Sequence, residues 1–289
     1  MQGTHQTDVG QWLLQLRLLS RDNMCAGPDF WRPFHFVTLG LQIARTGRSG
    51  LTIPPAFVGY ASRMGLWDAI GLETPAAVNA RDPHGKFVPL QRLDNADRVH
   101  ELSVKLADIC RAFGADKETL NSLEISLQEI MDNCFAHAGI SVDLQGLACA
   151  QSWPRGNLAQ IAIADIGVGI RRSLAANADL LDQLAYENSC ELATRFGVTG
   201  KPGMGHAGYG LALTRQLLQA NGGTLLVQSG DEWVRISGQN ISVGLSPYNW
   251  AGTLVLLEWD CSKPLRVKDV YRSWPAPTGF SDDDFDFPI

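Results

Sequence analysis

The chain has 289 residues, of which 45% are hydrophobic, and it carries a formal net charge of −6. This composition allows a large core, whereas the acidic balance argues against a general nucleic-acid binder, which needs excess Lys and Arg to neutralise phosphates. No apolar run approaches the roughly 20 residues that span a bilayer, and the N-terminus lacks a signal-peptide pattern. The six cysteines are scattered without a C-x-x-C pair, which favours free thiols in a reducing cytoplasm.

Residues 1–80 are predicted to form a small α/β domain. The apolar stretch 12–19 is typical of a strand or a short helix, and apolar residues recur at helical spacing over 30–45. A turn signal then leads into a short apolar strand at 51–53 and an amphipathic helix over 58–70. This β-α-β-α alternation predicts an α/β unit, and its end resembles the last helices of a STAS-like domain, the anti-sigma-antagonist fold.

A second domain is expected over 81–262, joined to the first by a Pro- and Gly-rich linker at 73–86. It opens with an edge strand at 87–93. A helix over 98–113 follows and is ended by a glycine. A long helix with an apolar face is then predicted over 117–138, with Asp116 as its N-cap.

The end of this domain is predicted to contain three strands in series, at 224–229, 233–237 and 253–259. Antiparallel strands backed by the preceding helices give a two-layer α/β sandwich. The remaining residues, 263–289, finish in an acidic and aromatic run at 280–289. That run has too few positions to build a core, so it is predicted to be a flexible tail.

Four short motifs follow one another in the second domain. Glu129, Asn133 and His137 are spaced four residues apart, so they lie on one side of the expected helix. A D-x-G-x-G turn ends an apolar strand, a G-x-x-G-x-G-L segment opens the next helix, and a Gly-Thr pair opens the last strand. Taken singly, each also fits an ordinary surface or turn. The residues of the last three motifs are Asp165, Gly167 and Gly169; Gly205, Gly208, Gly210 and Leu211; and Gly252 and Thr253.

In this order the motifs resemble those of the GHKL ATPase superfamily. That superfamily includes gyrase-type topoisomerases, MutL-type repair proteins, heat-shock chaperones of the ninety-kilodalton class, histidine kinases and anti-sigma serine kinases. The resemblance covers about 87–260 and implies a Bergerat ATP-binding fold, preceded here by the STAS-like segment. The E-x-x-x-N-x-x-x-H run looks closest to the anti-sigma serine kinases.

The resemblance implies a role for each polar residue. Asn133 is expected to ligate Mg²⁺ through its amide oxygen, and His137 continues the same row at the ATP site. Glu129 is expected to act as general base on the attacking group. Asp165 is expected to accept a hydrogen bond from the adenine amine, and Thr253 supports that carboxylate directly or through water.

The glycines are expected to bring the backbone close to the nucleotide. Those of the D-x-G-x-G turn approach the base, and those of the third motif form a lid whose amides and following helix bind phosphate. Lys201 is a further candidate for the γ-phosphate, and its alternative is a solvated loop lysine. The residues given nucleotide contacts in this way are Gly167, Gly169, Lys201, Gly205, Gly208, Gly210 and Leu211.

These expectations describe a cytoplasmic regulatory protein that binds Mg-ATP. It phosphorylates a Ser or Thr on a partner protein or on its own N-terminal domain, or it switches partner binding with ATP. A Glu at position 129 indicates water or a hydroxyl as acceptor, because histidine kinases commonly lack it. The alternatives are a slow ATPase whose lid closure drives homodimerisation or a conformational change, and a nucleotide sensor without catalysis. No membrane contact is expected.

Overall fold

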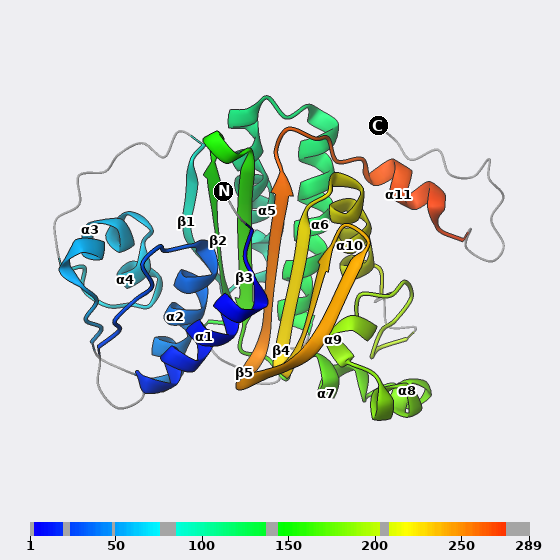
Figure 1. The fold of residues 1–289 in the computed structure, drawn as a ribbon, viewed down its shortest axis with the longest axis horizontal. Helices are drawn as coiled ribbons and strands as arrows, with labels where there is room; N and C mark the ends of the chain where they lie inside the picture. Colours follow the sequence, from blue (N-terminus) through cyan, green and yellow to red (C-terminus); the bar gives the residue numbers. More distant parts are fainter. Residues whose placement is uncertain are drawn as a thin grey trace.

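The computed structural model describes residues 3–19, 24–47, 50–75, 85–136, 144–202 and 208–275. In these parts of the chain, five antiparallel strands form one sheet in the order β1-β2-β3-β5-β4 (Figure 1). Strands β2 and β3 are buried at almost every position, which requires that both faces of the sheet be covered. The strands are β1 (Phe87–Leu93), β2 (Gly146–Trp153), β3 (Leu158–Asp165), β4 (Thr224–Ser237) and β5 (Asn240–Asp260).

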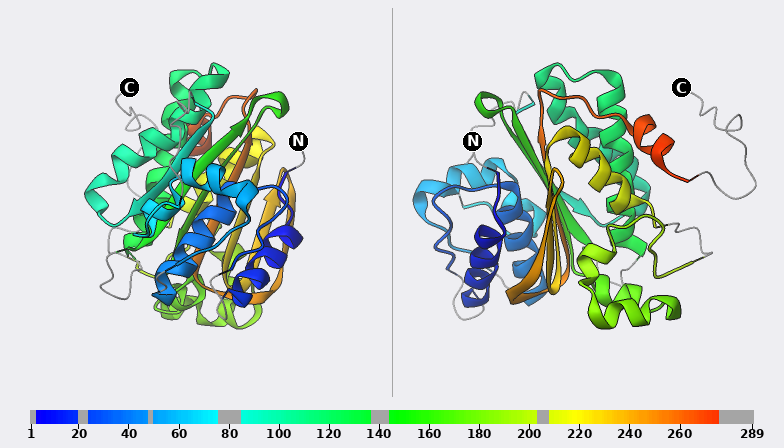
Figure 2. Two further views of the ribbon diagram at one scale, coloured as in Figure 1. Left: turned by 90° about the vertical axis from the view of Figure 1, so that its left-hand side faces the viewer. Right: turned by 45° about the vertical axis from the view of Figure 1, so that its right-hand side comes forward.

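Three helices, α5 (Val99–Ala107), α6 (Lys117–Ala136) and α10 (Gly210–Asn221), cover one face of the sheet (Figure 2). Their apolar sides share a core with β3, β4 and β5. The expected N-cap of α6 is confirmed, because Asp116 Oδ1 accepts a hydrogen bond from Thr119 N at 2.8 Å. The α/β sandwich predicted for this part of the chain is therefore present, with β1 at one edge of the sheet as expected.

The N-terminal region is helical, which corrects the predicted α/β alternation. It contains α1 (Gln6–Leu18), α2 (Pro33–Thr46), α3 (Pro55–Arg63) and α4 (Leu66–Ala69). The apolar stretch 12–19 lies almost wholly in α1, and the expected strand at 51–53 contributes one isolated bridge, from Thr52 to Met24. The described residues of this region therefore contain no sheet, and the STAS-like segment is not confirmed.

These helices form a second helical layer on the other face of the sheet (Figure 2). Their apolar side chains share one core with residues that β2, β3 and β5 direct to this face, such as Leu147, Ala162 and Leu256. An added Cβ on Gly40 of α2 would lie only 2.6 Å from Leu147 Cδ1, so the helix backbone packs closely on β2. The predicted two-layer sandwich thus has three layers: helix, sheet and helix.

A buried carboxylate ties the start of the chain to this face. Glu258 of β5 is 2% exposed and accepts hydrogen bonds from Thr4 N at 2.9 Å and from Gln160 Nε2 at 2.6 Å. Arg32 Nη1 lies 3.6 Å from the same carboxylate and donates to Thr4 Oγ1 at 2.7 Å. These partners compensate the desolvation of Glu258, and they fix Thr4 against the sheet.

The region after β3 departs from prediction at two places. β4 spans the two strands expected at 224–229 and 233–237, and β5 begins at Asn240, long before the expected strand at 253–259. Residues 267–273 form α11 (Val267–Ser273), whose Val267 and Val270 are buried in the core, so this part of the predicted flexible tail is ordered. The acidic and aromatic run at 280–289 lies outside the described residues. Among the helices that are described, none is both long and apolar enough to cross a bilayer.

Candidate functional site

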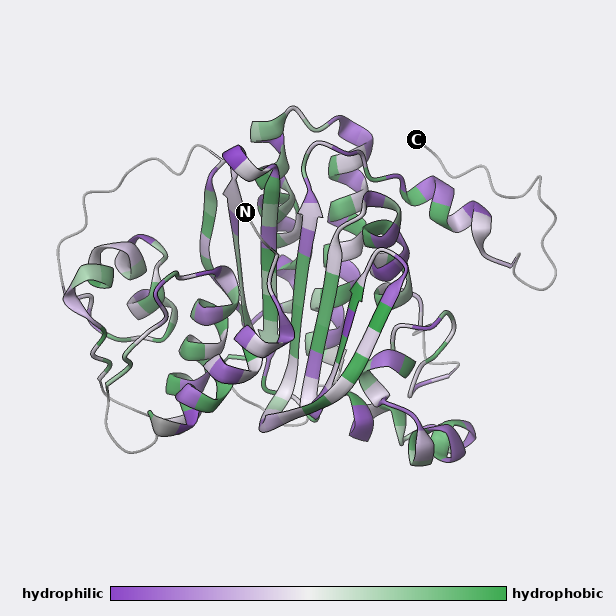
Figure 3. Ribbon diagram, in the orientation of Figure 1, coloured by the Kyte–Doolittle hydropathy of each residue, from purple (hydrophilic) through white to green (hydrophobic). Residues whose placement is uncertain are grey.

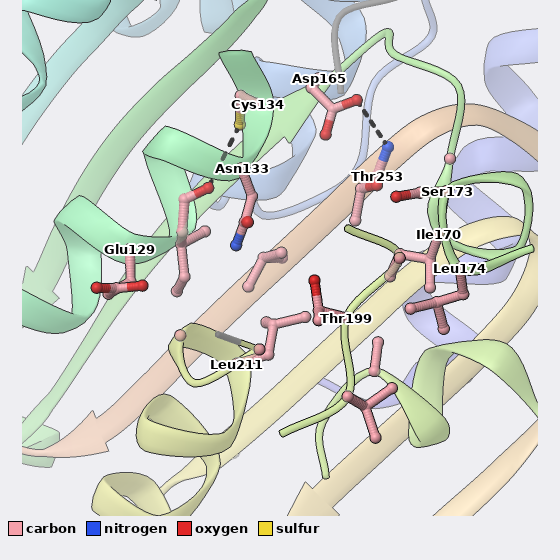
Figure 4. Close-up of a pocket in the computed structure, with 18 of the residues that line it drawn as sticks. Glu129, Asn133, Cys134, Asp165, Ile170, Ser173, Leu174, Thr199, Leu211 and Thr253 are labelled. Carbon is pink, nitrogen blue, oxygen red and sulfur yellow. Dashed lines mark hydrogen bonds between the residues drawn. The ribbon is translucent and has the colours of Figure 1, made fainter. Parts of the chain in front are cut away.

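A cavity of about 220 Å³ lies between α6, the start of α10 and the turn after β3 (Figure 4). It brings together most of the residues that the sequence predicts for the ATP site. Gly167 and Lys201 are described but do not line it, whereas His137 and Gly205 lie outside the described residues. The predicted residues that line the cavity are Glu129, Asn133, Asp165, Gly169, Gly208, Gly210, Leu211 and Thr253.

Asp165 is the buried acid of the cavity. It ends β3, is 9% exposed, and its Oδ1 accepts a hydrogen bond from Gly167 N at 2.7 Å. The same oxygen accepts a second bond from Thr253 N at 3.2 Å (Figure 4). Burial raises the pKa of the carboxyl from 3.8 to about 6, although the bonds from Gly167 and Thr253 lower it. The side chain is therefore mostly ionised at neutral pH and has strong acceptor capacity next to the cavity.

Glycine is required where β5 passes Asp165. Gly252 has φ +106°, and an added Cβ would lie 2.1 Å from Asp165 O. Ser229 of β4 strengthens the same junction, because its Oγ donates to Gly252 O at 2.7 Å and accepts from Ile170 N at 2.8 Å. The turn after β3 is thus held from two strands, which fixes the Asp165 carboxylate relative to the sheet.

Glu129 and Asn133 lie one turn apart on α6 at the point where α10 begins. An added Cβ on Gly210 would lie 2.8 Å from Glu129 Cβ and 3.6 Å from Asn133 Nδ2, so only glycine permits this approach. Farther along the two helices, Ser126 Oγ and Thr214 Oγ1 are 2.7 Å apart and hydrogen-bonded. The N-terminus of α10, with its partial positive charge, is therefore placed beside a carboxylate and an amide.

The segment between β3 and α10 closes the cavity on the side opposite α6. It contains the short helices α7 (Ile170–Leu174), α8 (Leu181–Tyr186) and α9 (Ser189–Leu192). Gly200 packs on α7, where an added Cβ would lie 2.0 Å from Ser173 O, and Gly208 packs in the same way on Val198. Lys201 N donates to Thr199 Oγ1 at 3.2 Å, and Thr199 itself lines the cavity.

The C-terminal helix adds an aromatic contact that the sequence did not predict. Trp274, directly after α11, packs against Phe196 and Tyr209, with ring centroids 4.7 and 5.2 Å away, and Tyr209 lines the cavity. Burial, followed by the charge of Glu129, raises the pKa of Tyr271 on α11. The end of the described chain therefore lies next to both Glu129 and the residue that precedes α10.

Sequence reasoning missed several lining residues. Ile163 faces the cavity because it lies two positions before Asp165, and residues two apart in a strand lie on the same face. This lining residue could therefore have been predicted from the position of Asp165. Burial, followed by the charge of Asp165, holds the pKa of the Cys134 thiol well above its usual value. Ser173, Thr199 and Val198 come from the connecting segment, which carries no motif. The other lining residues missed are Ile130, Ile170, Leu174, Ala193, Gly200, Tyr209 and Val255.

The donor set of the cavity limits which ions it can hold. Among the described residues, no group of three or more His, Cys, Asp or Glu side chains is arranged to hold a metal ion. Near α10, Glu129 and Asn133 supply a carboxylate and an amide oxygen. That small set of hard oxygen donors fits Mg²⁺, which takes one or two protein ligands when phosphate and water supply the rest.

Comparison with known proteins gives little beyond this geometry. No protein-family model matches the chain, and no curated protein matches it. Among solved structures, a histidine kinase domain from a blue-light-activated histidine kinase of Erythrobacter litoralis is 16% identical, covering 89% of this chain and 94% of that chain. The TM-score is 0.27. A likeness at this level assigns no function, so the chemistry of the site follows from its own side chains.

Proposed function

We propose that the cavity binds Mg-ATP and that the chain is a GHKL-type regulatory protein. In this role it phosphorylates a Ser or Thr on a partner protein or changes its affinity for that partner. The observation that carries the proposal is the Asp165 carboxylate, which is buried at the cavity wall and fixed by Gly167 N and Thr253 N. An ionised carboxylate can accept more hydrogen bonds than these two, and the exocyclic amine of adenine is a donor that could meet it from the cavity.

The other end of the cavity suits phosphate. The 12-residue helix α10 begins at Gly210, and its first N–H groups, which have no acceptor within the helix itself, lie near Asn133 and Glu129, where they could bind anionic oxygens. Mg²⁺ bound there would neutralise phosphate charge, with the Asn133 amide oxygen as its protein ligand. We assign no role to Lys201, because it does not line the cavity.

Glu129 is the residue to which we assign the role of general base. It lines the cavity one helical turn from Asn133, and its charge already influences Tyr271. In the proposed reaction its carboxylate takes the proton of the attacking hydroxyl, of a Ser, a Thr or water, as the bond to the γ-phosphorus forms and the bond to the β,γ-bridging oxygen breaks. General-base catalysis of this kind contributes about 10²–10⁴-fold to the rate.

The deciding experiment measures binding and turnover separately. ATP is titrated calorimetrically with and without Mg²⁺, and γ-labelled ATP is then followed into protein and into free phosphate. Glu129→Gln is expected to keep Mg-dependent binding and lose about 10²-fold or more of the turnover. Glu124→Gln, on the same helix but away from the cavity lining, is the matched control and is expected to retain both.

The possible results separate the alternatives. Label in protein supports the kinase, and label released as phosphate supports the slow ATPase. Mg-dependent binding without turnover in either protein supports a nucleotide sensor. Absence of ATP binding by the wild-type protein would contradict the proposed site altogether.

A further inference from the structure

The first half of β5 forms an open edge of the sheet. Residues 240–245 pair with 232–237 of β4, whereas β3 pairs with β5 only from Leu254 onward. In the described chain, no strand borders the other edge of 240–245, and Figure 1 shows this segment at the outside of the sheet. Toward the middle of β5, α1 takes over as a neighbour, since an added Cβ on Gly10 would lie 3.7 Å from Pro247 Cδ.

This open edge carries an apolar stripe. Ile241, Val243 and Leu245 alternate along the strand, and these residues are 42%, 48% and 72% exposed. Figure 3 shows hydrophobic colour alternating with paler colour along this outer part of β5. The sequence contains no charged residue from 238 to 257. Natural edge strands are usually protected from association by charges, so a long uncharged apolar edge indicates a surface that pairs with another strand.

The turn between β4 and β5 determines which backbone groups point outward. It contains two residues, Gly238 and Gln239, and Ser237 pairs with Asn240 across it. Gly238 has φ +54°, as the first position of a type II′ hairpin turn requires. In such a hairpin the flanking residues form a hydrogen-bonded pair, and bonded and non-bonded pairs alternate from there. The N–H and C=O groups of 241, 243 and 245 therefore point away from β4.

We propose that this edge pairs with the same edge of a second copy of the chain. The two strands run antiparallel about a two-fold axis that passes beside Val243, perpendicular to the sheet. Val243 then faces its own equivalent, and Ile241 of each copy faces Leu245 of the other. The outward N–H and C=O groups at these three positions bond across the axis, and the sheets of the two copies become continuous.

The spacing itself favours a second copy over an unrelated protein. A two-fold interface uses one patch twice, so the patch must be complementary to itself. An apolar residue at the centre with apolar residues two positions to either side meets this requirement, and it places six apolar side chains on one face. The absence of charge means that no like charges oppose each other. This inference is independent of nucleotide binding.

The test uses two double variants of the full chain with the same number of new charges. In Ile241→Lys with Leu245→Lys, the proposed register places lysine opposite lysine twice across the axis. In Ile241→Lys with Leu245→Glu, it places lysine opposite glutamate twice. Both variants change exposed positions, so circular dichroism is expected to show an unchanged fold. Sedimentation velocity over a concentration series gives the mass and the dimer dissociation constant.

The wild-type chain is expected to sediment with twice the mass of the 31.5 kDa monomer. The Lys/Lys variant is expected to dissociate at least about tenfold more readily than the Lys/Glu variant, because each opposed pair changes from repulsive to attractive. A monomeric wild type at every concentration would overturn the proposal. Equal dissociation constants for the two variants would also overturn it, because another surface would then form the dimer.

Discussion

Asp165→Asn is expected to affect folding and nucleotide binding in opposite directions. Burial raises the pKa of the Asp165 carboxyl from 3.8 to about 6. Because the folded-state pKa lies above the unfolded value, the folded protein holds the proton more tightly, and ionisation costs stability. That cost is absent below pH 3.8 and complete above about pH 6. At 1.36 kcal/mol per pKa unit, it amounts to about 3 kcal/mol.

An amide at this position carries no charge and keeps an oxygen that can accept from Gly167 N and Thr253 N. Asp165→Asn is therefore expected to raise the free energy of unfolding at pH 8 by up to about 3 kcal/mol, with little difference near pH 4. The same amide presents N–H groups to the adenine amine, so ATP affinity is expected to fall about 10- to 100-fold. The binding part rests on the proposed function, whereas the stability part does not.

Urea unfolding at pH 4, 6 and 8, followed by tryptophan fluorescence, measures the stability difference, and calorimetric titration measures ATP binding. Asp182→Asn, at an exposed position on α8, is the control for a change of net charge and is expected to have little effect. A variant that is less stable than the wild type at pH 8 would refute the reasoning. So would a stability difference that stays constant from pH 4 to pH 8, because desolvation of the charge would then not be its cause.

Three further changes test the packing around the site. In urea titrations, Gly252→Ala is expected to lower the free energy of unfolding by several kcal/mol, because the added Cβ would clash with Asp165 O. Gly71→Ala is the control. It also has a positive φ, of +72°, but its Cβ would meet no atom within 4 Å, so the free energy of unfolding is expected to fall by only about 1 kcal/mol. Trp274→Ala removes the indole ring that packs against Tyr209, so the segment between α9 and α10 is expected to open more often. Mass spectrometry of tryptic fragments is then expected to show faster cleavage in that segment. Deletion of 1–80 exposes one apolar face of the sheet, so the product is expected to bind a hydrophobic dye and to aggregate. A soluble product that unfolds cooperatively would contradict a core shared by the N-terminal helices and the sheet.

The site was predictable where its chemistry is local. Glu129 and Asn133 come together because helix geometry puts positions four apart on one side, and Asp165 is found from an apolar strand that ends in glycines. Thr199 and Ser173 enter the same cavity from a segment whose sequence has no motif. Their position depends on the close packing of Gly200 on α7, a tertiary contact that cannot be predicted from the spacing of residues in the sequence.

The fold was predictable for β1, β3 and the helices behind the sheet, but not for β2, the first half of β5 or the N-terminal layer. Val9, Trp12, Leu13 and Leu16 are all buried, at spacings of three, four and seven, which is helical periodicity. The stretch 12–19 alone fits a strand or a short helix, because it begins after Val9 and is too short to separate the two. The Pro- and Gly-rich segment at 73–86 predicts a joint between two domains. Such composition predicts a loop, but it does not say whether the elements before it have a core of their own.

The sequences of the central strands β2 and β3 indicate that a second helical layer is needed. Residues 147–150 of β2 and 161–164 of β3 are apolar without alternation and are buried throughout, so the sheet needs cover on both faces. The helices that follow in the sequence cover one face, which leaves residues before β1 to cover the other. Glu258 shows how specific that cover is. Its carboxylate is buried on this face, and Thr4, which is 254 positions away in the sequence, donates hydrogen bonds to it. Without the N-terminal layer, the sheet would carry an apolar face with an unpaired charge in it, so the first helices belong to the fold of the sheet.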